Sequence, residues 1–313
     1  MTVRDIHKTL GTIDTLTAGF ALVGKNLRLL VIPILLDVLL WIAPKLSVAP
    51  VVAQVTANLR DGLATLGATG GVDAGVNEMI ESLGASLQAS VGRTNVLAAL
   101  TWGRLGVPGV AGLRQIRPAT DHVLELNSYG QWIGVEAALL LIGLLLACAF
   151  LAMVAQTVGG EQPDLRKVAK RLPTHWLRLL VLLVPLAFVL MTVLGSSVVL
   201  GALAFLMWAV MIWVLIYVSF VPQAVIMSEQ PAPRAVIVSM TLVRQSFWPS
   251  FWLLVLVNVI NLGLSAVWAR VLGSSVGMAA TILLNAYVGT SLTAARYIYY
   301  RDRVAALRAA AQR

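Results

Sequence analysis

The chain has 313 residues, of which 59% are hydrophobic and 12% are charged, and its formal net charge is +9. Soluble domains usually carry about 25% charged residues, so this composition argues against a soluble globular protein. The positive charge falls between long apolar runs, as membrane topology requires, and this segregation argues against nucleic acid as the partner.

Taken in chain order, the apolar runs predict an all-α polytopic membrane bundle of about six transmembrane helices. A spanning helix needs about 20 mostly apolar residues. The runs lie at 27–46, 131–158, 177–227 and 249–295. The last two are too long for one helix, so each is interpreted as a hairpin of two spans. We expect the turn of the first hairpin at 194–197.

The segments between the runs also carry helical patterns. Residues 1–26 predict an amphipathic cytoplasmic helix that leads into the first span. Residues 47–130 predict a helical extracytoplasmic cap, because apolar residues recur at helical spacing from Val51 to Leu66 and again from Val76 to Val91. The fold is therefore expected to carry a folded insertion between the first two spans.

The distribution of lysine and arginine predicts the orientation. The four segments expected inside, 1–28, 159–178, 229–248 and 296–313, hold 16 of these residues, whereas 45–130, which has the same total length of 86 residues, holds six. The positive-inside rule then places both termini in the cytoplasm. It makes 159–176 a basic cytoplasmic loop, 228–248 a cytoplasmic interfacial helix and 296–313 a basic cytoplasmic tail.

An alternative for the first run is a cleaved signal peptide, since Ser47-Val48-Ala49 resembles a small-residue cleavage site. The long segment before the run, the acidic Asp37 inside it and Lys45 just after it do not fit that plan. We therefore expect a retained transmembrane helix.

Asp37 is the most unusual residue, because it lies near the middle of the first run. A carboxylate at the centre of a bilayer costs roughly 2.5–3.5 kcal/mol on insertion scales, so Asp37 should face the bundle interior, be protonated or be paired. One interpretation is a proton or cation site. The other is a hydrogen bond between helices, with Asn258, Asn261 or Asn285 as the partner.

Two inner segments look alike. Glu161-Gln162-Pro163 and Glu229-Gln230-Pro231 each precede a helical stretch and a hairpin, and the sequence VLGSS occurs at 193–197 and again at 271–275. The pattern fits either an internal repeat, as in some transporters, or chance identity in a compositionally biased chain.

Two stretches, GFALVGKNLRLLVIPILLDVLLW at 19–41 and the region from Tyr217 to Leu262, resemble a family of six-span bacterial membrane proteins. That family is related to the membrane domain of glycerophosphodiester phosphodiesterases and to YciC-like proteins. The resemblance implies the bundle architecture and a bacterial cytoplasmic membrane. No phosphodiesterase barrel is present in the sequence, so that activity does not carry over.

The sequence shows no catalytic or metal-binding pattern. It lacks GxSxG, HExxH and phosphate-loop motifs, its single cysteine is Cys148, and His7, His122 and His175 are far apart. We therefore expect no cofactor and no enzyme activity. The first hypothesis is a membrane accessory, scaffold or lipid-handling component that binds lipid or a membrane protein. The alternative is a secondary transporter or channel that uses Asp37. The oligomeric state stays open.

Overall fold

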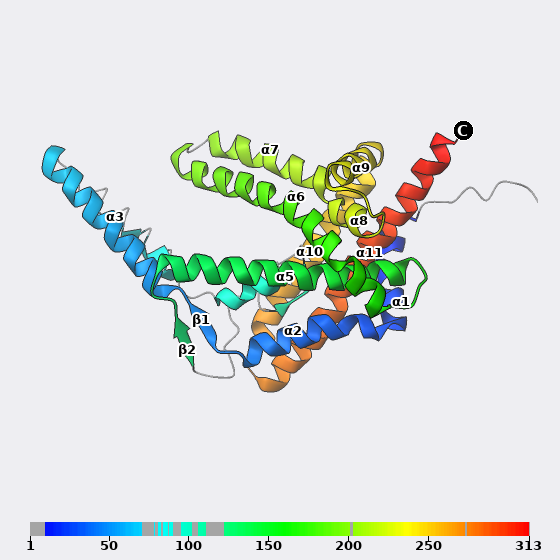
Figure 1. Ribbon diagram of the computed structural model, residues 1–313, viewed down its shortest axis with the longest axis horizontal. Helices are drawn as coiled ribbons and strands as arrows, with labels where there is room; N and C mark the ends of the chain where they lie inside the picture. Colours follow the sequence, from blue (N-terminus) through cyan, green and yellow to red (C-terminus); the bar gives the residue numbers. More distant parts are fainter. Residues whose placement is uncertain are drawn as a thin grey trace, which may run out of the picture.

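The structure, a computed structural model, describes residues 10–70, 78, 81–82, 84–86, 88–89, 95–101, 106–110, 122–200, 203–272 and 274–312. The described residues are 85% helical. Among the described residues, five helical segments are long and apolar enough to cross a membrane. This confirms the expected class of all-α membrane bundle. The five segments are α5 (Tyr129–Val158), α6 (Leu165–Leu200), α7 (Leu203–Val218) with α8 (Val221–Ile226), α10 (Phe247–Val271) and α11 (Ser275–Ala311) (Figure 1).

The first expected span is shorter than the sequence predicted. It consists of a 3₁₀ turn, η1 (Leu27–Leu30), and the helix α2 (Val31–Ile42). At 2.0 and 1.5 Å per residue these cover about 26 Å, less than the hydrocarbon core of about 30 Å. The run is apolar enough for a span, but its helix ends at Ile42.

The turn expected at 194–197 was wrong, because α6 continues to Leu200 and the connection to α7 falls between Leu200 and Leu203. An unbroken helix bonds its own backbone groups, which favours it at membrane depth. The second VLGSS, at 271–275, instead spans the end of α10 and the start of α11. The shared sequence thus takes two different structures, which weakens its support for an internal repeat.

Helices also cover most of the segments that were expected as a basic loop and a basic tail. Most of the basic segment 159–176 belongs to α6, whose first turn is capped by the carboxylate of Asp164, which accepts from the N–H of Arg166 at 2.9 Å. The tail 296–313 is largely the end of α11, which is helical to Ala311. Both segments are rich in good helix formers, and positive charge by itself does not break a helix.

A short break separates α7 from α8, and α9 (Ala232–Gln245) covers it. The hydroxyl of Ser239 on α9 donates to the carbonyl of Tyr217 at 2.7 Å and accepts from the N–H of Phe220 at 3.2 Å. One buried side chain therefore bonds backbone groups on both sides of the break. Pro222 fits the first turn of α8, where its missing N–H has no cost.

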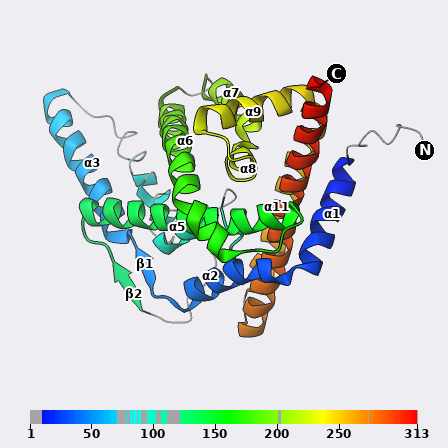
Figure 2. The ribbon, with the colours of Figure 1, turned by 45° about the vertical axis from the view of Figure 1, so that its right-hand side comes forward.

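The first described helix, α1 (Thr12–Lys25), packs along α11, as Figures 1 and 2 both show. Gly19 permits the approach, since a Cβ there would lie 2.5 Å from the carbonyl oxygen of Ser291 and 2.9 Å from Ala295. The rings of Phe20 and Tyr287 lie 5.9 Å apart. The beginning and the end of the chain are thus joined through a small-residue face.

A two-stranded parallel sheet closes the insertion between α2 and α5. Strands β1 (Lys45–Ser47) and β2 (Val123–Glu125) pair with Lys45 opposite Val123. From β1 the helix α3 (Ala49–Gly70) projects away from the bundle (Figure 1). It covers the first apolar stripe, whereas the residues that define the second stripe, from Val76 to Val91, lie outside the described residues.

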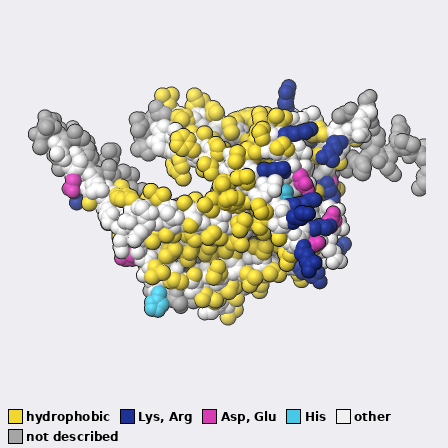
Figure 3. Space-filling model, in the orientation of Figure 1, with side chains coloured by type: hydrophobic (Ala, Val, Ile, Leu, Met, Phe, Trp, Pro, Cys, Tyr) yellow, Lys and Arg dark blue, Asp and Glu magenta, His cyan; other side chains and the backbone are white. Residues whose placement is uncertain are grey.

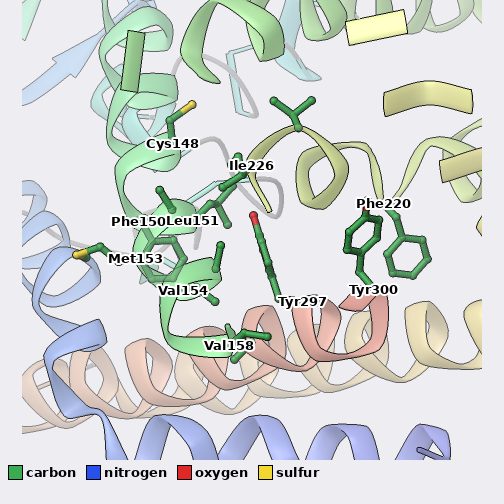
Figure 4. Packing of buried hydrophobic residues seen from close by; sticks show 14 of the residues in the cluster. Cys148, Phe150, Leu151, Met153, Val154, Val158, Phe220, Ile226, Tyr297 and Tyr300 are labelled. Carbon is green, nitrogen blue, oxygen red and sulfur yellow. The ribbon is translucent and has the colours of Figure 1, made fainter. Parts of the chain in front are cut away.

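The buried core gathers where α5, α8 and α11 meet. Figure 4 shows Tyr297 of α11 pointing between Leu151 of α5 and Ile226 of α8. The hairpin of α6 and α7 extends beyond this core, and side chains such as Phe188 and Phe205 are largely exposed there. An apolar surface of this kind suits contact with lipid chains.

Candidate functional site

Asp37 is buried inside the bundle, with 3% of its surface exposed. Its Oδ1 accepts a hydrogen bond of 2.8 Å from the backbone N–H of Val110. A Cβ on Gly109 would lie 3.1 Å from the same oxygen. The carboxylate thus holds the backbone of a segment that returns from the insertion.

This returning segment consists of η3 (Val96–Thr101) and residues 106–110, which we call the re-entrant segment. Val107 and Val110 are fully buried. Pro108 lies directly against Gly289 of α11, and a Cβ on Gly143 of α5 would lie 2.6 Å from the carbonyl oxygen of Leu100. Only glycine, which has a hydrogen atom in place of a Cβ, leaves room for these two contacts.

The contacts place the re-entrant segment deep among the helices. Gly143 and Gly289 each lie 14 residues from the start of their helices, which corresponds to about 21 Å along the axis. Irregular backbone at such depth is tolerated where protein buries it and supplies hydrogen bonds. Asp37 supplies one of these bonds.

The three asparagines that the sequence grouped with Asp37 lie on other helices. Asn258 donates to the carbonyl of Leu254 at 2.8 Å, and the carbonyl of Asn261 accepts from Ser265 at 2.7 Å, both within α10. Asn285 is half-buried on α11. The hydrogen bond that the structure describes at Asp37 comes instead from backbone, which the sequence pattern could not reveal.

Lysine and arginine gather at one end of the molecule, and we call this the basic end (Figure 3). Several of these arginines bond helix C-termini. Arg301 donates to the carbonyl of Val158 at the end of α5 at 2.7 Å, and Arg296 donates to the carbonyl of Ser219 just after α7 at 2.6 Å. A cation at a helix C-terminus donates hydrogen bonds to carbonyls that have no partner in the helix, and it interacts favourably with the negative end of the helix dipole. Part of the basic character is therefore structural.

A cavity of about 270 Å³ lies at the basic end, between the end of α5, the start of α6 and the end of α8. We call it the basic-end pocket. Its apolar wall includes Ala152, Ala155, Val168, Ile226 and Met227. At about 30 Å³ per water, the volume equals on the order of nine water molecules. It is large enough for a small polar group next to an apolar chain.

The polar wall of the basic-end pocket carries two ion pairs and a histidine. Lys167 pairs with Glu161 at 3.0 Å, and Arg171 pairs with Glu229. His175 is 4% exposed, and its Nδ1 is buried without a hydrogen-bond partner among the described residues. A buried polar atom without a partner costs free energy unless a ligand or water satisfies it.

Glu229 is held firmly at the rim of the basic-end pocket. Its φ is 51°, in the left-handed region that only glycine adopts freely. Arg178 donates to its carbonyl oxygen at 2.7 Å, while Arg171 bonds its carboxylate. The bond from Arg178 thus fixes the backbone of this strained residue, and Arg171 forms an exposed ion pair with its carboxylate.

The basic-end pocket was missed at the level of sequence, although a signal for it was present. The two similar tripeptides, Glu161-Gln162-Pro163 and Glu229-Gln230-Pro231, supply its two carboxylates. Both carboxylates pair with cations of α6. The likeness was interpreted as a possible repeat of hairpins, whereas its structural counterpart is a shared pocket. His175 was considered only as a metal ligand.

Comparison of the chain with protein-family models, with curated proteins and with solved structures found no match. The resemblance to six-span bacterial membrane proteins therefore stays a prediction. Among the described residues, no group of three or more His, Cys, Asp or Glu side chains could hold a metal ion.

Proposed function

We propose that this chain is a non-enzymatic, lipid-handling membrane protein that holds a lipid headgroup in the basic-end pocket. The observation that carries the proposal is a pocket at the basic end that combines an apolar wall with exposed charges and the unpartnered Nδ1 of His175. Such a mixed lining matches the junction between a polar headgroup and its chains.

The position of the pocket supports this function. Lysine and arginine concentrate at the basic end (Figure 3), and in a positive-inside protein such a concentration is typical of the cytoplasmic side. The largely exposed Trp248 lies in the first turn of α10 near the same end, and such rings favour the interface. We therefore infer that the basic end faces the cytoplasm of a bacterial inner membrane, with β1 and β2 on the opposite side.

Native mass spectrometry of protein purified in mild detergent tests the proposal. We expect a phospholipid adduct on the wild type, loss of this adduct in Arg171→Gln and retention in Arg234→Gln. Arg234 is an exposed arginine on α9 that does not line the basic-end pocket, so it controls for the removal of one charge. A wild type without lipid, or an Arg171→Gln variant that keeps as much lipid as the wild type, would contradict the proposal.

Asp37 provides less support for the alternative of a transporter or channel. Its hydrogen bond to Val110 gives the carboxylate a structural task, the retention of the re-entrant segment. A flux measurement on Asp37→Asn distinguishes the two roles.

A further inference from the structure

The charges on the wall of the basic-end pocket balance. Among the described residues that line it, two are cationic, Lys167 and Arg171, and two are anionic, Glu161 and Glu229. Each cation pairs with one carboxylate, and all four side chains are about half exposed or more. Exposed ion pairs contribute little to stability, so a ligand can open them readily.

The balance decides which headgroup fits. A purely anionic headgroup would take the cations and leave Glu161 and Glu229 next to its negative charge. A headgroup with one phosphate and one ammonium can exchange with the existing pairs instead. Its phosphate replaces a carboxylate on Arg171 or Lys167, its ammonium replaces a cation on Glu229 or Glu161, and the net charge stays zero.

His175 gives the phosphate a further partner. His175 lines the same wall, one helical turn from Arg171 on α6, and its Nδ1 is buried without a hydrogen-bond partner among the described residues. Residues four apart lie on the same face of a helix, so the imidazole and the guanidinium can reach one group together. An N–H on Nδ1 can donate to a phosphate oxygen, and the guanidinium can donate to the same phosphate in a charge-assisted bond.

The amine of the headgroup should be primary. A primary ammonium has three N–H donors, which suits two carboxylate acceptors. A trimethylammonium group has no N–H donor and is usually held by an aromatic cage. Among the described residues that line the basic-end pocket, His175 is the only one with a ring.

We propose that the basic-end pocket selects a zwitterionic phosphate headgroup with a primary amine, of the phosphoethanolamine type, carried by a diacyl lipid. This inference rests on the proposed function and goes further, because it names the headgroup. The phosphate lies on Arg171 and His175, and the ammonium lies on Glu229.

Lipid titrations of the delipidated full chain, followed by native mass spectrometry, test this selectivity. The probes are short-chain phosphatidylethanolamine, phosphatidylglycerol, phosphatidylcholine and water-soluble glycerophosphoethanolamine. Phosphatidylethanolamine should bind at least about tenfold more tightly than phosphatidylglycerol and phosphatidylcholine, a factor that one hydrogen bond to a charged group supplies. It should also bind more tightly than glycerophosphoethanolamine, which has the same headgroup and lacks the acyl chains. Glu229→Gln should remove most of its preference over phosphatidylglycerol, whereas Glu125→Gln, on the exposed strand β2, should leave it unchanged.

The outcomes separate the two proposals. Binding of no phospholipid by the wild type refutes the lipid-handling function itself. Equal or tighter binding of phosphatidylglycerol, or an unchanged preference in Glu229→Gln, leaves lipid binding intact and overturns the headgroup assignment. Equally tight binding of glycerophosphoethanolamine overturns a lipid as the source of the headgroup.

Discussion

Replacement of Gly143 by alanine tests how the insertion docks on the bundle. A Cβ at this position would lie 2.6 Å from the carbonyl oxygen and 2.8 Å from the Cα of Leu100. These are backbone atoms of η3, so a simple side-chain rotation cannot relieve the clash. Overpacking of this kind typically costs about 1–3 kcal/mol.

Gly134 provides the matched control, because it lies on the same helix and a Cβ there would meet nothing within 4 Å. The gain in helix propensity from glycine to alanine, up to about 1 kcal/mol, is common to both substitutions. The free energy of unfolding of Gly143→Ala should therefore fall about 1–3 kcal/mol below that of Gly134→Ala. Unfolding by SDS in mixed micelles measures both values, and equal values would refute the docking of η3 on α5.

Three further predictions follow from other contacts. Asp37→Leu should lower the free energy of unfolding by about 1–3 kcal/mol, because it leaves the buried N–H of Val110 without its acceptor. Asp37→Asn keeps an acceptor, so it should lower the free energy of unfolding less and leave ion flux in proteoliposomes unchanged. Loss of flux in Asp37→Asn would restore the transport hypothesis. His175→Leu should raise the free energy of unfolding of the delipidated protein by about 1 kcal/mol, since it removes the buried Nδ1 that has no partner among the described residues. The same variant should no longer be stabilised by added lipid. If it is less stable than the wild type without lipid, His175 has a purely structural role. Glu125→Cys should react with an impermeant maleimide in intact cells, whereas Arg234→Cys should react only after lysis. The background reaction should be low because Cys148 is buried. The opposite labelling pattern would reverse the orientation.

The class of the fold followed from the sequence because it depends on the length of apolar runs. A run of about 20 apolar residues is stable in lipid only as a helix, because a helix bonds all of its own backbone groups. This rule applies whatever other segments pack beside the run. Helix ends were less predictable. The shortness of α2 goes with the insertion that follows it, which local propensity does not contain. The continuation of α6 through 194–197 keeps its backbone groups bonded within one helix, which a turn signal in the sequence does not take into account.

The candidate sites show the same division. The burial of Asp37 was expected from its place in an apolar run, whereas its bond to Val110 joins residues 73 apart in the chain. The basic-end pocket likewise joins Glu161 and Glu229 through a common helix. No spacing rule links such residues, although the repeated Glu-Gln-Pro tripeptide marked both of them.

The packing of α1 against α11 bears on how the protein is made. Gly19 and Phe20 meet Ser291 and Tyr287, so their partners leave the ribosome only after all the helices between α1 and α11 have been made. Until then Gly19 lacks its partner on α11, and Pro108 lacks its contact with Gly289. The docking of α1 on α11 is thus a nonlocal step that waits for the helices in between. A chain truncated before α11 would keep its hairpins in the membrane with these faces unmatched, and such exposed faces are what cellular quality control can act on.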